Sequence, residues 1–440
     1  MHKFKIYYLD AIAFVLYFTL LMTKARLRLD NTSEFHFGGA EYAIAPFDIA
    51  FVLIIIIIII KIYFSEFKIA KDKLNLIAGL YILINIASIL TSSDREFTFY
   101  ELVRQVKFFI IYLWLRSVFS NSKGKKLLYV SSCFAILVQL FFVYLQYLTG
   151  TTTSGINNEE VELNKIAGGL VRTVGTFGHP GLLGQYLNII LTIILVKTLM
   201  TDGLQKKIYA TMYLMGTLAV ILTYSRTALA IQMATLILIL YLAPSRETSK
   251  NISKKLITYI SVFFGFITVI AMNYESIIGR FENASVDSGE VRILLSKIAL
   301  NMIAENPITG VGLNAFTQTM DRYDSSMMSS YWRHPVHNIY LLVAAEIGLI
   351  GVLIFLAKLY IFFKVGIKTL RDRKTPDLID KEFSLIGVVG LSVICLSGFL
   401  GWSWRLDAIQ GLYWTLLAVI ACTYKRPRFL RAKPIRASKP

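Results

Sequence analysis

Residues 334–351 read HPVHNIYLLVAAEIGLIG, and this stretch indicates both the fold class and the place where chemistry is expected. It opens with two histidines, His334 and His337, separated by a proline that resists helix. From His337 onward it is an apolar helical run interrupted by Glu346. A polar, titratable cluster therefore lies at the mouth of an expected membrane span, and an ionisable residue within a span is a functional hypothesis.

Apolar runs of this kind recur along the whole chain. Of its 440 residues, 55% are hydrophobic, more than the roughly 45–50% of a soluble globular domain. We expect an all-α polytopic membrane protein, with residues 1–440 forming a single integral membrane domain of about twelve spans. The expected spans lie near residues 6–22, 47–64, 74–91, 104–120, 127–148, 182–200, 207–224, 227–243, 256–272, 337–362, 384–401 and 408–424. The isoleucines of 54–60 are expected to face lipid.

The net charge of +18 is better explained by membrane lipids than by nucleic acid. The basic residues fall mainly in short segments between spans, as the positive-inside rule requires of cytoplasmic loops. This predicts a multi-pass protein of the cytoplasmic (inner) membrane with both termini cytoplasmic and a basic tail at 425–440. The longest extracytoplasmic loop is then 273–336, with a helix from near Ser288 to Asn306.

Several function classes lack their signatures. Cys133, Cys395 and Cys422 are isolated thiols within apolar runs and suit neither a disulfide framework nor a metal site. The two histidines form HxxH rather than HExxH, and no acidic cluster occurs outside, so no metal and no cofactor is expected. Without a nucleotide-binding loop, the energy must come from an activated substrate.

Four elements of the predicted outer face carry the candidate chemistry: RTVGTFGHPGLLGQY at 172–186, TYSR at 223–226, Arg292, and RHPVHN at 333–338. Guanidinium forks bind phosphate oxygens in two places and never deprotonate, and a nearby imidazole can take a proton from an attacking hydroxyl. This predicts displacement of a phosphate-linked leaving group. The candidate catalytic residues are His337, Arg226 and Arg292, and the candidate substrate-binding residues are Arg172, Arg333, His334, Asn338 and Glu346.

Each candidate also has a structural interpretation. An interfacial arginine can extend to lipid headgroups, a loop histidine can simply pack, and a carboxylate within a span can pair with an arginine to hold the bundle. These alternatives stay open for Arg226, His334 and Glu346, and Arg292 could pair with Glu290 or Glu305. Gly348 and Gly351 are expected to be helix-packing contacts.

In this order the motifs resemble the O-antigen ligase and polymerase superfamily. The resemblance rests on an outer-loop arginine, SR at the start of a span, and His337-Asn338 followed after nine residues by Gly-Leu-Ile-Gly. The stretches NPITGVGLNAF and GTFGHPGLLGQYL are also similar to the family's. Two departures are Val352, where many ligases have threonine, and HPVHN in place of HPHN.

The resemblance implies a metal-independent, inverting glycosyltransferase with a C-type glycosyltransferase-like membrane fold. Its donor would be an undecaprenyl-diphosphate-linked glycan, its acceptor a glycan or lipid hydroxyl, and its role surface polysaccharide biosynthesis. His337 would help activate the acceptor, while Arg226 and Arg292 hold the diphosphate, with Arg172 and Arg333 as further candidates. Ligase and polymerase stay open, as do a polysaccharide-lipid transporter or flippase and a non-catalytic scaffold.

Overall fold

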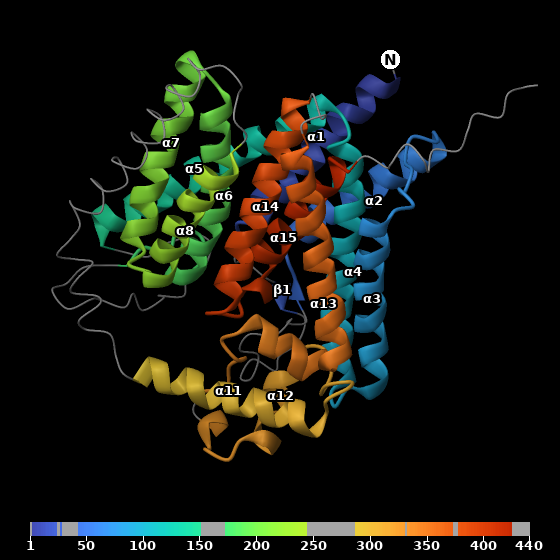
Figure 1. Cartoon of the computed structure of the whole chain (residues 1–440), viewed down its shortest axis with the longest axis vertical. Helices are drawn as coiled ribbons and strands as arrows, with labels where there is room; N and C mark the ends of the chain where they lie inside the picture. Colours follow the sequence, from blue (N-terminus) through green and yellow to red (C-terminus); the bar gives the residue numbers. More distant parts are fainter. Residues whose placement is uncertain are drawn as a thin grey trace, which may run out of the picture.

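The computed structural model describes residues 2–23, 27–28, 43–150, 172–243, 287–330, 332–372 and 377–424. It shows a bundle of long helices with two further helices, α11 and α12, lying across one end (Figure 1). The first elements are α1 (His2–Leu20), β1 (Leu27–Arg28), β2 (Ala43–Ile44), α2 (Phe47–Tyr63), α3 (Lys73–Thr91), α4 (Arg95–Val118), α5 (Ser122–Thr149), α6 (Pro180–Met200), α7 (Gly203–Leu222) and α8 (Arg226–Leu242). They are followed by α11 (Asp287–Glu305), α12 (Phe316–Tyr323), η1 (Met328–Ser330), α13 (Ile339–Arg371), α14 (Leu378–Gly398), η2 (Ser403–Arg405) and α15 (Asp407–Cys422).

The helical fold class is confirmed. Apart from the two-residue antiparallel pair β1–β2, regular structure in the described ranges is helical. Each expected span except 256–272, which lies outside the described residues, coincides with a helix. Four described helices, α3, α5, α6 and α13, are long and apolar enough to cross a membrane. The protein is therefore of membrane type, and the full number of spans stays a prediction.

Short links make consecutive helices antiparallel. Two or three residues join α3 to α4, α4 to α5, α6 to α7 and α7 to α8, and links this short only let the next helix fold back. One end of the bundle therefore collects the residues 92–94, 172–179, 223–225, 307–338 and 399–406, and we call it the loop end. Backbone hydrogen bonds join these segments directly, from Ser93 N to Val311 O (2.9 Å) and from Thr173 N to Leu222 O (3.1 Å).

Side-chain caps fix where helices begin at the loop end. Asp94, Ser225 and Asn338 each accept a hydrogen bond from the first turn of the helix that follows, which satisfies amide groups that otherwise lack partners. His179 does the same for α6 through Nδ1, which accepts from Gly181 N (3.1 Å). Four helix starts are thus held in defined positions around the candidate site.

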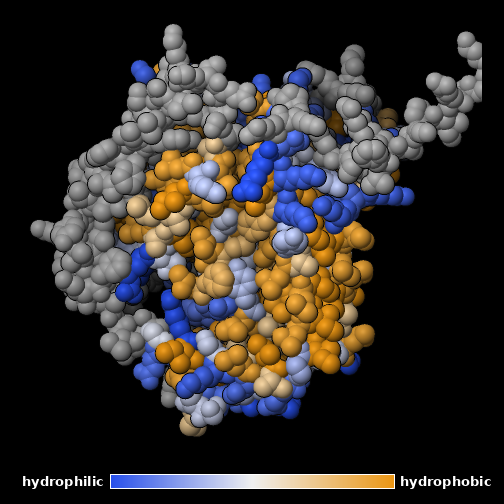
Figure 2. Space-filling view, in the orientation of Figure 1, coloured by the Kyte–Doolittle hydropathy of each residue, from blue (hydrophilic) through white to orange (hydrophobic). Residues whose placement is uncertain are grey.

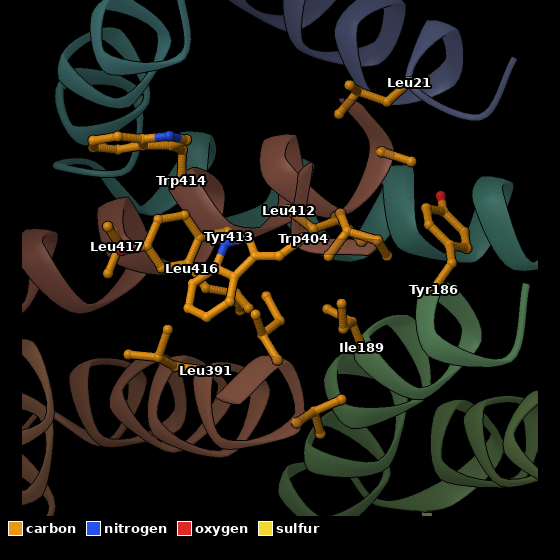
Figure 3. Packing of buried hydrophobic residues seen from close by; sticks show 14 of the residues in the cluster. Leu21, Tyr186, Ile189, Leu391, Trp404, Leu412, Tyr413, Trp414, Leu416 and Leu417 are labelled. Atoms are coloured by element: carbon orange, nitrogen blue, oxygen red, sulfur yellow. The ribbon is translucent and has the colours of Figure 1, made fainter. Parts of the chain in front are cut away.

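Aromatic side chains fill the centre of the bundle below the loop end. Figure 3 shows Trp404 next to Tyr413 of α15, while Trp414 lies on another side of α15, with its ring centroid 5.7 Å from that of Tyr112 on α4. The ring centroids of Trp404 and Tyr413 are 4.8 Å apart in an edge-to-face arrangement. Glycines on α14 let α15 come close, since a Cβ on Gly387 would lie 2.3 Å from the Ile420 side chain. Small residues at helix contacts are typical of membrane bundles.

The basic residues within α4 are paired with residues of other helices. Lys107 reaches Asp48 on α2 (2.7 Å), and Arg116 forms a salt bridge with Asp72, the cap of α3. The polarity of the molecular surface also differs between the bundle and the helices that lie across its end. Figure 2 shows an apolar band over α3 and α13 and a hydrophilic surface over α11 and α12.

The isoleucine run on α2 corrects one expectation. Ile54, Ile57 and Ile58 are buried inside the bundle, whereas Ile56 and Ile59 are exposed. The prediction that the whole run faces lipid is therefore wrong for one side of the helix.

Candidate active site

His337 lies at the start of α13 in a segment held from both sides. Val336 before it is fully buried, and Asn338 after it caps α13 by accepting from Tyr340 N (2.9 Å) and Leu341 N (3.1 Å). These anchors leave the imidazole half-buried at the loop end, and its Nδ1 has no hydrogen-bond partner within the described residues. This nitrogen is buried, so its open hydrogen-bonding position faces the interior of the protein rather than solvent.

Three cationic or titratable side chains surround this imidazole. Burial, followed by the charges of Arg292, His334 and His179, lowers the pKa of His337 from 6.5 to about 4. Because each neighbour disfavours a second positive charge, His337 is neutral near pH 7 and able to accept a proton. Among these groups the guanidinium of Arg292 favours an anion placed beside it, whereas burial lowers the pKa of His334.

Arg292 reaches this cluster from α11, whose position follows from its packing. Leu295, Ala299 and Met302 are buried at helical spacing, and Arg292 lies on the same helix face one turn earlier. Its side chain is exposed. The predicted helix from near Ser288 to Asn306 is confirmed by α11 (Asp287–Glu305).

The structure does not show the alternative in which Arg292 pairs with Glu290 or Glu305. Glu305 forms its salt bridge with Arg322 on α12 (3.5 Å), and within the described residues neither Glu290 nor Glu305 forms one with Arg292. Its guanidinium instead acts on His337.

Arg172 and Arg226 meet at the turn between α7 and α8. Tyr224 takes a left-handed conformation there (φ 49°), which reverses the chain and makes Arg226 the first residue of α8. The buried Arg172 donates from Nε to the Thr223 carbonyl (3.2 Å), so its guanidinium lies against this same turn. The two arginines therefore come from segments about fifty residues apart and share one position at the loop end.

Helix α6 connects this turn to the histidine cluster. Asn188 donates to the Ala228 carbonyl of α8 (2.8 Å), and a Cβ on Gly184 would lie 2.5 Å from Ala228 Cβ. The same helix begins at His179, which acts electrostatically on His337. The structure thus brings Arg292, His334 and His337 together, and it places Arg172 and Arg226 at the α7–α8 turn that packs against α6, the helix capped by His179.

Arg333, beside this cluster, has structural partners. It forms a salt bridge with Asp321 and donates to the Thr317 carbonyl (3.2 Å), which ties the segment before α13 to α12. His334 packs its ring against Trp332, with centroids 4.6 Å apart. Their substrate-binding roles stay predictions, as does that of the cap Asn338.

Glu346 is almost fully buried within α13 and forms a salt bridge with Arg405 of η2. This agrees with the alternative in which the Glu346 carboxylate pairs with an arginine to hold the bundle, and that arginine is Arg405. Arg405 lies near a second buried group, in which Arg104 bridges Glu101 and Asp407. A role for Glu346 at the substrate would be indirect, through the loop that carries Arg405.

Helix α13 is broken directly after Glu346. Ile347 (φ −119°, ψ 15°) and Gly348 (φ 71°, ψ −179°) leave the helical conformation. The segment 307–312 fills the break, with Val311 N donating to Ala345 O, Gly312 N to Glu346 O (both 2.9 Å) and Leu349 N to Pro307 O (2.8 Å). A Cβ on Gly348 would lie 2.0 Å from Ile308 O, so only glycine fits.

This break changes the interpretation of the Gly-x-x-Gly motif. Gly348 was expected to pack against a neighbouring helix, but it instead lets the backbone of NPITGVG enter α13. The same contact explains Gly310 (φ 68°), where a Cβ would lie 2.4 Å from the Glu346 carbonyl carbon. The motifs NPITGVG and Gly-x-x-Gly are separate in the sequence but contact each other in the structure.

Sequence reasoning missed two residues of the site. His179 lies within the quoted stretch RTVGTFGHPGLLGQY but was assigned no role, and its HP dipeptide before an apolar run was the available signal for a cap. Arg405 lies in a loop with no recognised motif. Within the described residues, no group of three or more histidine, cysteine, aspartate or glutamate side chains could hold a metal ion.

Residues 210–356 match the family model of the O-antigen ligase domain, Wzy_C. This segment is similar to O-antigen ligases. The predicted resemblance to the ligase and polymerase superfamily is confirmed. The matched domain includes Arg226, Arg292, His337 and the broken part of α13, and it supports a membrane enzyme of ligase or polymerase type. No curated protein matches the chain.

Proposed function

We propose that the protein is a membrane glycosyltransferase that moves a glycan from an undecaprenyl-diphosphate-linked donor to an acceptor hydroxyl at the outer leaflet of the cytoplasmic membrane. The observation that carries this proposal is the convergence of Arg292, His334 and His179 on a half-buried, neutral His337. That group lies in the segment matched by the O-antigen ligase family, apart from His179.

The geometry suits a single in-line displacement. His337 takes the proton of the acceptor hydroxyl as the oxygen forms a bond to C1 of the donor sugar, and the bond from C1 to the diphosphate oxygen breaks. The electron pair leaves with the diphosphate, whose charge Arg292 and Arg226 stabilise. Attack from the side opposite the leaving group inverts C1, and the reaction needs no metal.

Donor binding also prepares the base. In the free protein, burial and then the neighbouring positive charge keep the pKa of His337 low. A bound diphosphate brings opposite charge next to the same guanidinium group, so it raises that pKa and strengthens the imidazole as a proton acceptor. The base therefore becomes effective when the donor is in place.

One feature of the fold could also suggest a transporter, because transporters use broken helices to expose backbone groups to ions. In α13, however, the carbonyl groups of Ala345 and Glu346 already accept hydrogen bonds from Val311 and Gly312. The break is filled by protein, which favours the enzyme over a flippase. Turnover in detergent without any gradient would exclude transport.

The deciding experiment supplies purified protein in detergent with lipid-linked donor and follows the product by mass. Wild type should give either longer lipid-linked chains or glycan on a new acceptor, which separates polymerase from ligase. His337→Ala and Arg292→Ala should lose at least about a hundredfold in rate. Arg322→Ala, which removes an exposed arginine from the same end, should keep the wild-type rate. Normal transfer by His337→Ala would refute the proposal.

A further inference from the structure

The tryptophans divide sharply by environment. The chain has five, and Trp114, Trp404 and Trp414 are buried in the bundle. Trp332 is 45% exposed and Trp402 is partly exposed. The two with accessible surface come from the segments 307–338 and 399–406, so both lie at the loop end.

His334 lies between these two tryptophans. Its ring centroid is 4.6 Å from that of Trp332, at 37°, and 6.5 Å from that of Trp402, at 34°. Two chain segments about seventy residues apart thus contribute three neighbouring rings. At these distances and small interplanar angles the rings form a tilted stack, and its accessible surface belongs to the indoles of Trp332 and Trp402.

The backbone under this surface is fixed before any ligand arrives. Trp332 N donates to Met328 O (2.9 Å) and His334 N to Trp332 O (3.1 Å). On the other side, Ser403 donates to Gln185 of α6, and Arg405 N donates to Trp402 O (2.9 Å). Rigid, pre-positioned aromatic rings lose little conformational entropy on binding.

We propose that Trp332, His334 and Trp402 form a stacking platform for the pyranose rings of the lipid-linked glycan. The inference rests on the proposed function and adds the residues that hold the sugar chain. Sugar rings present apolar C–H faces beside hydroxyl edges, and indole rings match this with a flat apolar face and a polar N–H. His334 is three residues from His337, so rings stacked here would lie next to the reacting C1.

Lipid is the competing occupant, because tryptophans also gather at membrane interfaces. The surroundings favour the sugar. The salt bridge of Arg333 with the well-exposed Asp321 lies beside His334 in sequence, and the exposed apolar side chains of α13 begin only at Leu349. Phe399 and Leu400 are exposed just before Trp402, so the platform lies where the hydrophilic end meets apolar surface.

Tryptophan fluorescence of the purified protein tests the proposal directly. The probe is the oligosaccharide that mild acid releases from the lipid-linked glycan of the source cells, added without its lipid. Wild type should show saturable quenching. Trp332→Ala and Trp402→Ala should weaken this binding by about tenfold, the size expected for one lost stacking contact. Trp332→Phe should recover most of it, and Tyr63→Ala, at an exposed aromatic residue on α2, should bind as wild type does.

Kinetics with the complete donor should agree. Trp332→Ala should raise KM by about tenfold while kcat stays within about twofold of wild type. His337→Ala should bind the free oligosaccharide normally yet transfer nothing, so loss of the platform and failure of the proposed reaction give different results. If brominated lipids in nanodiscs quench Trp332 while the oligosaccharide does not, the rings are a membrane anchor and the proposal is wrong. Unchanged oligosaccharide binding in Trp332→Ala would also overturn it.

Discussion

Burial and neighbouring positive charge both disfavour the protonated form of His337. Burial is the larger cause, followed by the charges of Arg292, His334 and His179. In the free protein the pKa therefore falls from 6.5 to about 4.

The pH dependence of kcat/KM should show this depressed pKa. The base works in its neutral form, so the rate should be flat from neutral pH down to about 5 and should fall below that, instead of falling near 6.5 as an unperturbed histidine would require. Steady-state kinetics with purified protein and varied donor measure this. A descending limb centred near 6.5 would contradict the environment described for His337.

Arg292→Gln provides the matching comparison. Removing its positive charge should raise the pKa of His337 and move the acid limb to higher pH, while the rate at neutral pH falls. Arg322→Gln removes a charge from the same end without touching the cluster and should leave the limb in place.

The buried salt bridge of Glu346 with Arg405 gives a prediction about stability. Glu346→Ala leaves a buried guanidinium without its partner, which costs about 3–5 kcal/mol in comparable buried pairs. The thermal midpoint in detergent should fall, and Glu346→Leu combined with Arg405→Leu should recover much of the loss. An unchanged midpoint for Glu346→Ala would show that the pair does not hold η2 to α13.

Residue types were predictable at this site, but partners were not. The arginines and His337 were recognisable because their chemistry suits diphosphate and their motifs have fixed spacing. Arg405 could not be paired with Glu346 from sequence, because the two are separated by fifty-nine positions and no periodicity connects them. The functional roles of the candidate residues stay predictions.

At the scale of elements, α13 shows what glycine spacing leaves undecided. A glycine in an apolar run is compatible with close helix packing and with a positive φ, and only the backbone shows which applies. The isoleucines of α2 have the same ambiguity, since identical residues around a helix carry no information about which side is buried. Helix positions were predictable from length and hydrophobicity, whereas the break and the buried face were not.

Gly348→Ala tests the contact between α13 and 307–312. The new Cβ would meet Ile308 O at 2.0 Å in a conformation that disfavours side chains, so the loop must leave the break. We expect a lower thermal midpoint and loss of transfer. Gly79→Ala is the matched control, because α3 is regular there and the nearest atom would be 3.9 Å away. It should be neutral or slightly stabilising. Equal behaviour of the two variants would contradict the docked loop.

For the whole molecule, the antiparallel helices divide the surface into two ends with different charge chemistry. At the end opposite the loop end, Lys125 pairs with Asp380 (2.6 Å) and Lys197 with Glu382 (2.9 Å). Basic residues near these pairs led to the prediction of a cytoplasmic side. The loop end is then extracytoplasmic, where a lipid-linked donor would be available.

Cysteine labelling in intact cells tests this orientation. Ser326→Cys at the loop end should react with a membrane-impermeant maleimide added outside, and Lys207→Cys at the start of α7 should react only after the cells are opened. Both positions are exposed in the structure. The reverse pattern would place the candidate site on the cytoplasmic side and end the proposed reaction at the outer leaflet.

The interruption of α13 also marks how deep the helix enters the membrane. Its first limb, Ile339 to Glu346, is mostly enclosed by protein, whereas the second exposes Leu349, Ile350, Leu353 and Leu356 along the apolar band of Figure 2. We therefore expect acyl chains to begin at about Leu349. Eight helical residues rise ~12 Å, which is more than the thickness of one headgroup layer. The number of residues between His337 and Gly348 would then set the distance of the His337 imidazole from the hydrocarbon core of the bilayer. This distance would match the height at which a polyprenyl lipid presents its phosphates and first sugar.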